Sequence, residues 1–282
     1  MATGSVRVTA RPWPAAGGGL AHLPGQAPLG LGLALAYLSV VVLIPIAALV
    51  GTATGAWSQG AWRALTNPQT LAALALTVSS SALVTLVNLV AGTAIAWVLV
   101  RDRFVGRGLL DAVVDLPLAL PTIVAGLTLL TLYGPQSPIG VNLAYTRLAI
   151  ALALLFVTFP FVVRAVQPVL LALDPEVEAA ARSMGAGGWT FFRHIVLPQL
   201  TPALIAGGVL AFARALGEYG SVALISGNIP FSTQVASVYI FGEVEQGSTG
   251  NAAVISFLLL LLTLVVLVGA DVLRRRMLGD AD

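Results

Sequence analysis

The pattern of apolar and polar positions divides most of the chain into six long apolar segments. They predict membrane spans at Leu31–Ala53, Leu71–Val100, Leu109–Leu132, Leu148–Leu173, Leu200–Ser226 and Ala252–Val272. Each is close to the roughly 20 residues that a helix needs to cross the hydrocarbon core of a bilayer. We therefore expect an all-α integral membrane protein with six transmembrane helices.

One stretch between the fourth and fifth apolar segments is both charged and patterned, from Asp174 to Pro198. Asp174 is a typical N-cap residue, and Pro175 stands at the first helical position, where its missing N–H costs nothing. A helix is therefore expected to begin here, directly after the fourth span.

This helix continues through Glu178 and Arg182, which are four residues apart in the acid-first order that stabilises a helix. The apolar positions on its other face are Val177, Ala181 and Met184. Gly185 is suited to end the helix, and a second short helix is expected over residues 189–196, up to Pro198. The segment therefore predicts a helix–turn–helix elbow between two spans.

Composition supports a membrane protein and excludes several kinds of chemistry. The 282 residues are 58% hydrophobic and 9% charged, whereas soluble domains carry about 25% charged residues. All basic side chains are arginines, so a Walker A lysine and Schiff-base chemistry are excluded. With no cysteine and only His22 and His194, thiolate zinc sites and iron–sulfur clusters are excluded, and we expect no metal site.

Arginines are unevenly distributed between the two sets of loops. One set holds Arg7, Arg11, Arg101, Arg103, Arg107, Arg182, Arg193, Arg274, Arg275 and Arg276, and the other holds Arg63 and Arg147. Because positive charge is retained on the cytoplasmic side, both termini, the 101–108 loop and the 174–198 elbow are expected in the cytoplasm.

The domain boundaries follow from the same pattern. Residues 1–28 are rich in glycine, proline and alanine and predict a disordered cytoplasmic tail. Residues 29–276 form the transmembrane domain, and 277–282 form a C-terminal tail. In the last external loop, apolar residues over 235–241 predict a short amphipathic helix at the outer surface.

The third span contains acids and prolines. Asp111 and Asp115 are four residues apart near its cytoplasmic end, so their shared face is expected to meet an arginine from a neighbouring element. The two acids serve either in an interfacial ion pair or in transport. Pro117 and Pro121 free backbone carbonyls at membrane depth, which is tolerated mainly beside a cavity or a partner helix. Pro121 and Thr122 therefore either line a translocation pathway or mark a simple kink.

The fifth span contains a charge pair, Arg214 and Glu218, inside apolar sequence. Because an intramembrane charge is costly, the two are expected to pair. They form either a structural ion pair or, with Ser221, part of a pathway. Gly207 and Gly208 should allow another helix to approach closely. The pathway candidates are Pro121, Thr122, Arg214, Glu218 and Ser221.

The elbow resembles the cytoplasmic EAA loop of importer-type ABC transporter permeases. The matching residues are Glu178, Ala179, Ala180, Gly185, Ile195, Leu197 and Pro198. One extra alanine places Glu178 one residue earlier than in the commonest form, so the alternative register runs over Ala180, Ala181 and Arg182. The resemblance implies that these residues contact an ATPase.

Three further stretches are similar to the sulfate/thiosulfate permease branch, and specifically to its T-type subunit: DLPLALPTIVAGLTLLTLYGPQSPIG, FVTFPFVVRAVQPVLLALDPE and FARALGEYGSVALISGNIP. The similarity extends over about Leu31 to Arg276. It implies a non-enzymatic permease subunit of an ATP-driven importer of sulfate or thiosulfate in the bacterial cytoplasmic (inner) membrane.

The resemblance also implies the partners. These are an ABC ATPase dimer that binds ATP and Mg²⁺, a second, homologous permease subunit and an external sulfate-binding protein, in addition to the lipid bilayer. No cofactor is expected on this chain itself, and the formal charge of +2 does not suggest nucleic acid.

Two alternatives remain at this stage. Among the ABC permeases that the sequence resembles, the alternative is a permease for molybdate or tungstate. From a different class, an ion-coupled secondary transporter would need a dedicated ion site at the middle of the membrane, and it gives no reason for the elbow.

Overall fold

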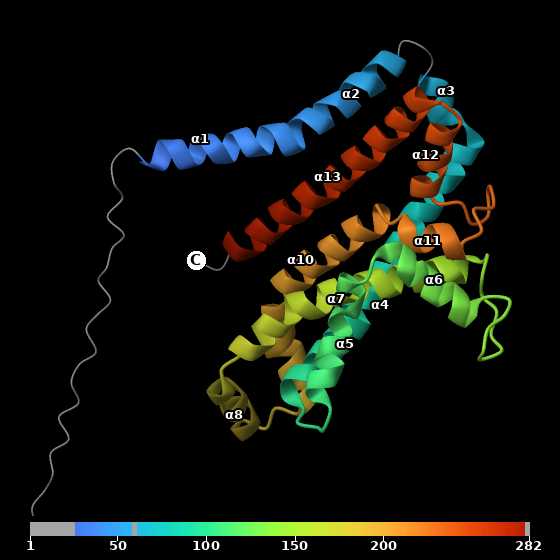
Figure 1. The fold of residues 1–282 in the computed structure, drawn as a ribbon. Coiled ribbons are helices and arrows are strands. Elements are labelled where there is room, and N and C mark those ends of the chain that lie inside the picture. The colour runs from blue at the N-terminus through green and yellow to red at the C-terminus, as the bar shows by residue number, and fades with distance from the viewer. Residues whose placement is uncertain (1–25, 58–60, 280–282) are drawn as a thin grey trace, which may run out of the picture. The chain divides into compact units, whose positions relative to one another are not determined.

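The structure, a computed structural model, describes residues 26–57 and 61–279, and all regular structure in these residues is helical (Figure 1). The helices in chain order are α1 (Gln26–Leu38), η1 (Ser39–Leu43), α2 (Ile44–Trp57), α3 (Ala61–Thr66), α4 (Pro68–Arg101), α5 (Arg107–Ala119), α6 (Thr122–Tyr133), α7 (Arg147–Ala172), α8 (Pro175–Ser183), α9 (Gly188–Phe191), η2 (Phe192–Val196), α10 (Leu197–Leu216), α11 (Gly220–Ile225), α12 (Ala236–Glu245) and α13 (Thr249–Gly279). Most of the predicted N-terminal tail and the end of the C-terminal tail lie outside the described residues.

Helices long and apolar enough to cross a membrane account for all six predicted segments. Five are continuous helical stretches, at Gly30–Ala56, Pro68–Arg101, Arg147–Ala172, Gly188–Leu216 and Thr249–Arg276. The sixth is the pair α5 and α6, which together are long and apolar enough but are bent by 113°. The chain divides into two compact units after Ala48, and the candidate site lies in the second.

The third predicted span is therefore broken, not a single helix. Leu120 has an extended backbone (φ −81°, ψ 136°) and Pro121 begins the next helix as its N-cap residue (φ −56°, ψ 131°). A residue before proline is pushed out of the helical region by the proline ring, which explains the break at this position. Pro117 lies inside α5 without interrupting it.

The fifth predicted span is wrong at both ends. At its C-terminal end, α10 stops at Leu216, and α11 is a separate short helix that begins at Gly220. At its N-terminal end, α9, η2 and α10 form one continuous stretch, so Pro198 does not end a helix. The π-helical turn η2 accommodates this proline: the Leu197 N–H bonds to the Phe192 carbonyl, five residues back, directly before the residue that lacks an N–H.

The helices α4, α7 and α10 pack closely through small residues. A Cβ on Gly92 of α4 would lie 3.0 Å from the Val162 side chain of α7, and one on Gly207 of α10 would lie 2.8 Å from the Ala165 Cβ, also on α7. These contacts confirm that the glycines of the fifth segment allow close helix approach. Asn88 of α4, buried beside them, donates to the Thr158 hydroxyl of α7 at 2.8 Å.

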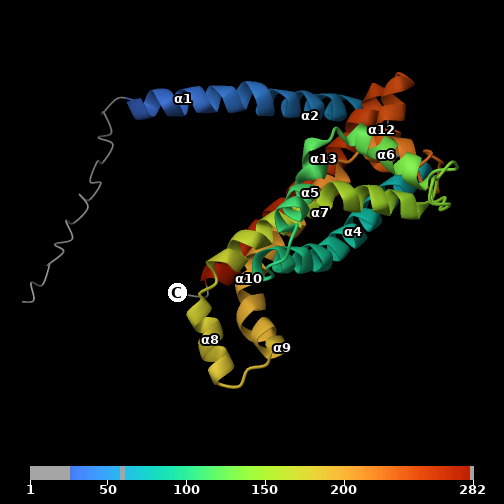
Figure 2. The same ribbon diagram turned by 60° about the horizontal axis from the view of Figure 1, so that its bottom comes forward.

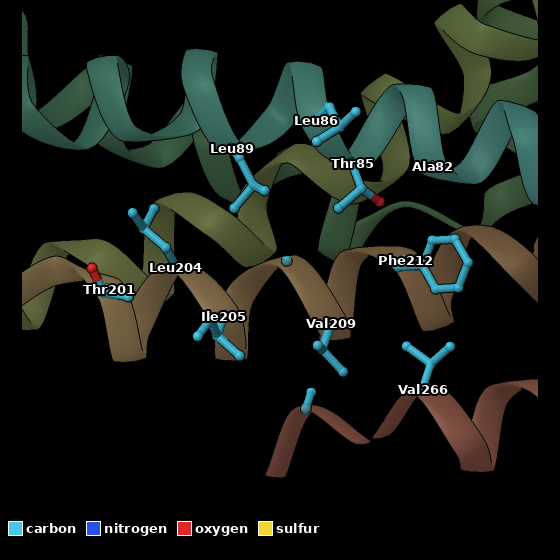
Figure 3. A pocket seen from close by; sticks show the side chains of 12 residues that line it. Ala82, Thr85, Leu86, Leu89, Thr201, Leu204, Ile205, Val209, Phe212 and Val266 are labelled. Atoms are coloured by element: carbon cyan, nitrogen blue, oxygen red, sulfur yellow. The ribbon is translucent and has the colours of Figure 1, made fainter. Parts of the chain in front are cut away.

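An open groove of about 460 Å³ lies between α4, α10 and α13 (Figure 3). The side chains of Leu89 and Thr85 on α4 face Leu204 and Phe212 on α10, and Val266 of α13 borders the same space (Figure 3). The lining contains no charged side chain. The lining is therefore almost entirely apolar.

The helix predicted in the last loop is present as α12, but it is not a free surface helix. Ala236 and Tyr239 are buried, and the Ala236 N–H donates to the Thr77 hydroxyl of α4 at 2.8 Å. The Thr70 hydroxyl of α4 donates to the Tyr239 hydroxyl at 3.3 Å. Helix α12 is thus fixed to the first half of α4.

Candidate coupling elbow and polar cluster

The first arm of the elbow is α8, and it starts as the sequence predicts. The Asp174 carboxylate accepts a hydrogen bond from the Glu176 N–H at 2.8 Å, and Pro175 occupies the first helical position. An N-cap of this type satisfies one of the backbone donors left free at a helix start.

The turn after α8 depends on Gly185. Its backbone is left-handed (φ +80°), the Gly185 N–H bonds to the Arg182 carbonyl, and the Ala186 N–H bonds to the Ala181 carbonyl, both at 3.0 Å. This pair of bonds is the Schellman arrangement that favours glycine after a helix. Gly185 therefore ends the helix, as predicted.

The elbow carries an exposed apolar surface. Of the predicted apolar face, only Ala181 is covered (2% exposed), whereas Met184 is 80% exposed and Val177 is also exposed. Trp189, at the start of the second arm, is 70% exposed. Among the residues that match the EAA pattern, Ile195 is half-buried, and the exposed ones are Ala179, Ala180, Gly185, Leu197 and Pro198. Met184 and Trp189 are therefore large apolar side chains held outside the protein core.

Glu178 makes two ion pairs. Its Oε1 meets Arg182 on the same helix at 2.5 Å, as the four-residue spacing predicts. Its Oε2 meets Arg101, the last residue of α4, at 2.8 Å. The second pair was not predicted, because 77 residues separate its members and no local pattern links them.

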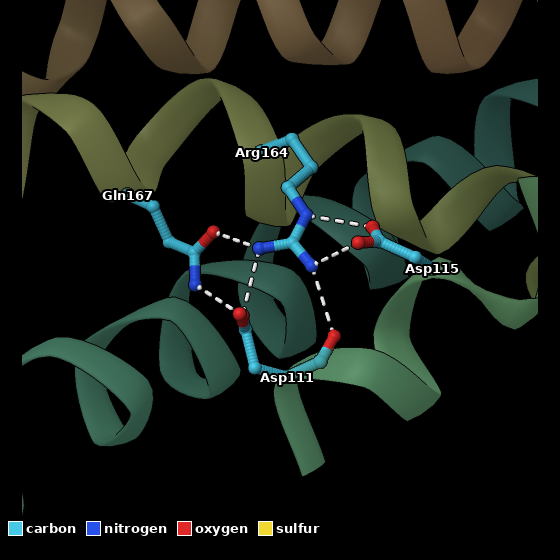
Figure 4. A network of polar contacts seen from close by, with 4 residues as sticks. All are labelled: Asp111, Asp115, Arg164 and Gln167. Atoms are coloured by element: carbon cyan, nitrogen blue, oxygen red, sulfur yellow. Dashed lines mark hydrogen bonds and ion pairs between the residues drawn. The ribbon is translucent and has the colours of Figure 1, made fainter. Parts of the chain in front are cut away.

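A second ion-pair cluster joins α5 to α7. Arg164 of α7 bonds to Asp111 through Nη1 at 2.7 Å and to Asp115 through Nε at 2.7 Å (Figure 4). Gln167 accepts from the same Nη1 and donates to Asp111 (Figure 4). The prediction that the two acids share an arginine from a neighbouring element is confirmed.

The third polar group lies where α10 ends. Arg214 pairs with Glu218 at 2.5 Å, and the Glu218 side chain is 1% exposed. The N–H and the hydroxyl of Ser221 both donate to Glu218 Oε1 at 2.8 Å. Glu218 is therefore held in the gap between α10 and α11, and not inside a span as predicted from the continuous apolar pattern.

The break between α5 and α6 meets this gap directly. A Cβ on Gly126 of α6 would lie 2.6 Å from the Ser221 carbonyl oxygen, and a Cβ on Gly220 would collide with the Thr122 hydroxyl. The structure thus brings Pro121 and Thr122 to the same place as the Arg214, Glu218 and Ser221 group. Of these two glycines, Gly126 was not singled out from the sequence, although its place shortly after Pro121 was an available signal. Among the described residues, no group of three or more potential metal ligands occurs.

Comparison with known proteins places these features in a family. Residues 88–279 match the model of the binding-protein-dependent transport system inner membrane component. The sulfate transport system permease protein CysT of Escherichia coli is 44% identical over 262 residues, which cover 90% of this chain and 94% of that protein. The protein of the same name from Synechocystis is 40% identical over 246 residues, which cover 85% of this chain and 86% of that protein.

Solved structures agree on the fold. A bacterial alginate ABC transporter, in complex with its alginate pentasaccharide-bound periplasmic protein, matches with a TM-score of 0.74 at 18% identity and covers 89% of this chain and 94% of that one. The MetNI methionine ABC transporter, in an inward-facing conformation, matches with a TM-score of 0.53 at 18% identity. The match covers 78% of this chain and 95% of that one. This chain is a multi-pass membrane protein that belongs to the family of binding-protein-dependent transport system inner membrane components of ABC importers.

Proposed function

We propose that this chain is the permease subunit of an ATP-driven importer of sulfate and thiosulfate. The proposal is supported by relatives that are 40–44% identical over most of their length and are named as sulfate transport permeases. Because the chain has no lysine for a P-loop, energy from ATP must in this scheme come from another chain.

The observation that carries the proposal is the elbow formed by α8, the Gly185 turn and α9. Its exposed Met184 and Trp189 provide apolar contact area, and Gly185 leaves open space next to them. Residues from Glu178 to Leu197 form the surface that a nucleotide-binding subunit would hold. Closure of two such subunits around ATP would draw the elbows of two permeases together and switch the spans between outward-facing and inward-facing states.

The complete transporter contains a homologous second permease, an ATPase dimer that binds ATP and Mg²⁺, and an external binding protein that delivers the anion. It lies in the cytoplasmic (inner) membrane of a bacterium, with the elbow and both termini in the cytoplasm, and the arginine distribution supports this orientation. This chain binds no cofactor of its own in this scheme.

The anion pathway passes the cluster of Pro121, Thr122, Arg214, Glu218 and Ser221. This cluster combines a broken span with a cation and hydroxyl groups, and irregular backbone at membrane depth is tolerated where it lines a cavity. Because Glu218 already partly neutralises Arg214, the anion would be held only weakly and could leave.

An uptake experiment tests the substrate. The chain would be expressed with its partner subunits in cells that lack their own sulfate permeases, and uptake of radiolabelled sulfate would be measured with and without competitors. We expect a hundredfold excess of thiosulfate to block uptake, a hundredfold excess of molybdate to leave it nearly unchanged, and ATP depletion to abolish it.

The same experiment separates the alternatives. Strong inhibition by molybdate or tungstate would assign the chain to those anions. Uptake that persists without ATP but disappears when the ion gradients are dissipated would assign it to the secondary transporters and would overturn the proposed role of the elbow.

A further inference from the structure

The last turn of α4 is in contact with both arms of the elbow. Arg101 reaches α8 through Glu178, with 2.8 Å between Nη1 and Oε2. Trp97, one turn earlier, packs edge-on against Phe192 of the second arm, with ring centroids 5.7 Å apart. Figure 2 shows α8 and α9 projecting together from the bundle at this end. The last turn of α4 therefore contacts both arms of the projection.

Arg101 is held firmly on its own helix. Its guanidinium lies over the Trp97 ring, 5.5 Å from the centroid, at the distance of a cation–π contact. Phe192 stacks in turn on Trp189, with centroids 5.8 Å apart. Arg101, Trp97, Phe192 and Trp189 thus form a continuous chain of contacts from α4 to the exposed tip of the second arm.

The two arginines paired with Glu178 differ in whether they connect α8 to another helix. Arg182 belongs to α8 itself and its side chain is 73% exposed, so this pair moves with the helix. Arg101 belongs to α4, and the side chains of Arg101 and Glu178 are 22% and 23% exposed. Only the Arg101 pair joins α8 to a span, and its partial burial protects it from screening by salt.

The geometry of the Arg101 pair permits a small rotation. It uses one guanidinium nitrogen, and the buried Nε–H of Arg101 has no acceptor among the described residues. A pair made through one nitrogen fixes a distance without fixing an angle, unlike the two parallel bonds that arginine and a carboxylate can form. A shift of α8 could bring Nε to Glu178 without breaking the connection.

We propose that Arg101 is a positioning residue that ties the coupling helix α8 to α4 through Glu178, so that movement of the elbow is passed to the spans. This inference rests on the proposed function of the elbow as the contact for the ATPase. Glu178, the acid of the EAA pattern, thereby makes a contact within the chain in addition to lying on the surface proposed for the ATPase.

The first test compares two matched variants in the complete transporter, reconstituted in proteoliposomes with its ATPase, second permease and binding protein. Arg101→Met removes a cationic partner of Glu178, and Arg103→Met removes an exposed arginine two residues further along that lies outside the elbow. Both variants keep the aliphatic stem. We expect Arg101→Met to lower the number of sulfate ions imported per ATP hydrolysed about tenfold, and Arg103→Met to change it less than twofold.

A double-variant cycle identifies the partner. If Arg101 acts through Glu178, the variant Arg101→Met/Glu178→Gln should be no worse than Glu178→Gln alone. Full additivity of the two losses would overturn the proposal. So would an Arg101→Met chain that assembles poorly but imports normally for each assembled complex, because the residue would then serve only folding.

A second measurement does not depend on the substrate. The chain has no cysteine, so spin labels can be placed at Val98→Cys on α4 and Glu176→Cys on α8. We expect one narrow distance distribution with and without nucleotide in the native background, and a broadened one after Arg101→Met. Equal distributions in both backgrounds would overturn the connection, whereas failure of sulfate uptake by the native transporter would instead contradict the proposed substrate.

Discussion

Gly185 is the residue at which the elbow should tolerate least change. Its φ of +80° is costly for other residues, but a Cβ there would meet nothing within 4 Å. Gly185→Ala should therefore cost about 1 kcal/mol of strain and little contact energy, and Gly185→Asn less, because asparagine tolerates this conformation. Gly185→Glu should add a bulky charge to the docking turn and abolish coupling while the chain stays in the membrane.

Copurification with the ATPase checks this prediction. The amount of chain in the membrane is measured by immunoblot, the bound ATPase by affinity purification, and sulfate uptake in the same cells. Normal ATPase recovery and uptake with Gly185→Glu would contradict a docking role for this turn. Gly185→Asn serves as the matched control, because it changes the side chain without adding charge.

Arg214 has a different kind of importance, since its loss would leave Glu218 as a buried carboxylate without a cation. Arg214→Ala should destabilise the chain by about 2–5 kcal/mol, towards the low end because Arg214 is about one-third exposed. Arg214→Ala/Glu218→Gln should recover most of that stability. If the double variant is stable but imports sulfate slowly, Arg214 serves the anion pathway. If Arg214→Ala alone shows wild-type stability and uptake, the ion pair serves neither stability nor the pathway.

Residues that act on their sequence neighbours could be predicted from the sequence. Asp174 caps α8, Gly185 ends it, and both effects depend on atoms within a few residues. The contact of Asp111 with Arg164 could also be predicted, because an acid inside an apolar segment requires a cation. The contact of Arg101 with Glu178 could not be predicted, because Arg101 stands at the edge of a span, where water satisfies an arginine and no partner is required.

At the scale of elements, the junction of α6 and α11 rests on close backbone approach. A Cβ at Gly126 would lie 2.6 Å from the backbone carbonyl oxygen of Ser221, which cannot move aside as a flexible side chain can. Gly126→Ala should separate the two helices and cost about 1–3 kcal/mol. Gly108→Ala on α5 is the control, because a Cβ there would meet nothing within 4 Å.

Thermal unfolding in detergent measures this difference. We expect a lower midpoint for Gly126→Ala than for Gly108→Ala, together with slower sulfate uptake, because the displaced α6 begins at Thr122. Equal midpoints for the two variants would show that α6 and α11 separate without cost.

The limits of the six segments could be predicted where hydropathy changes sharply, but not where the chain turns inside an apolar run. The predicted span Leu200–Ser226 is apolar enough to resemble one helix, and yet α10 ends at Leu216. Hydropathy reports which residues avoid water and does not report the direction of the helix axis. Gly217 and Gly220, on either side of the buried Glu218, were the local evidence for a break.

At the scale of the whole molecule, charge separates the two ends of the described bundle. The elbow and the loop after α4 lie at one end, and the α11–α12 segment lies at the other (Figures 1 and 2). The first end carries Arg101, Arg103, Arg107, Arg182 and Arg193. The fold therefore gathers arginines that are distant in sequence onto one face, which is the condition for the positive-inside rule to set orientation.

Cysteine labelling tests that orientation in intact cells. The chain has no cysteine, and Ser183 on the elbow and Ser232 before α12 are both exposed, so Ser→Cys at either position is a mild change. A membrane-impermeant maleimide applied to spheroplasts should label Ser232→Cys at once and Ser183→Cys only after permeabilisation. The reverse pattern would place the elbow outside the cell, away from ATP, and the proposed energy coupling through α8 would then be wrong.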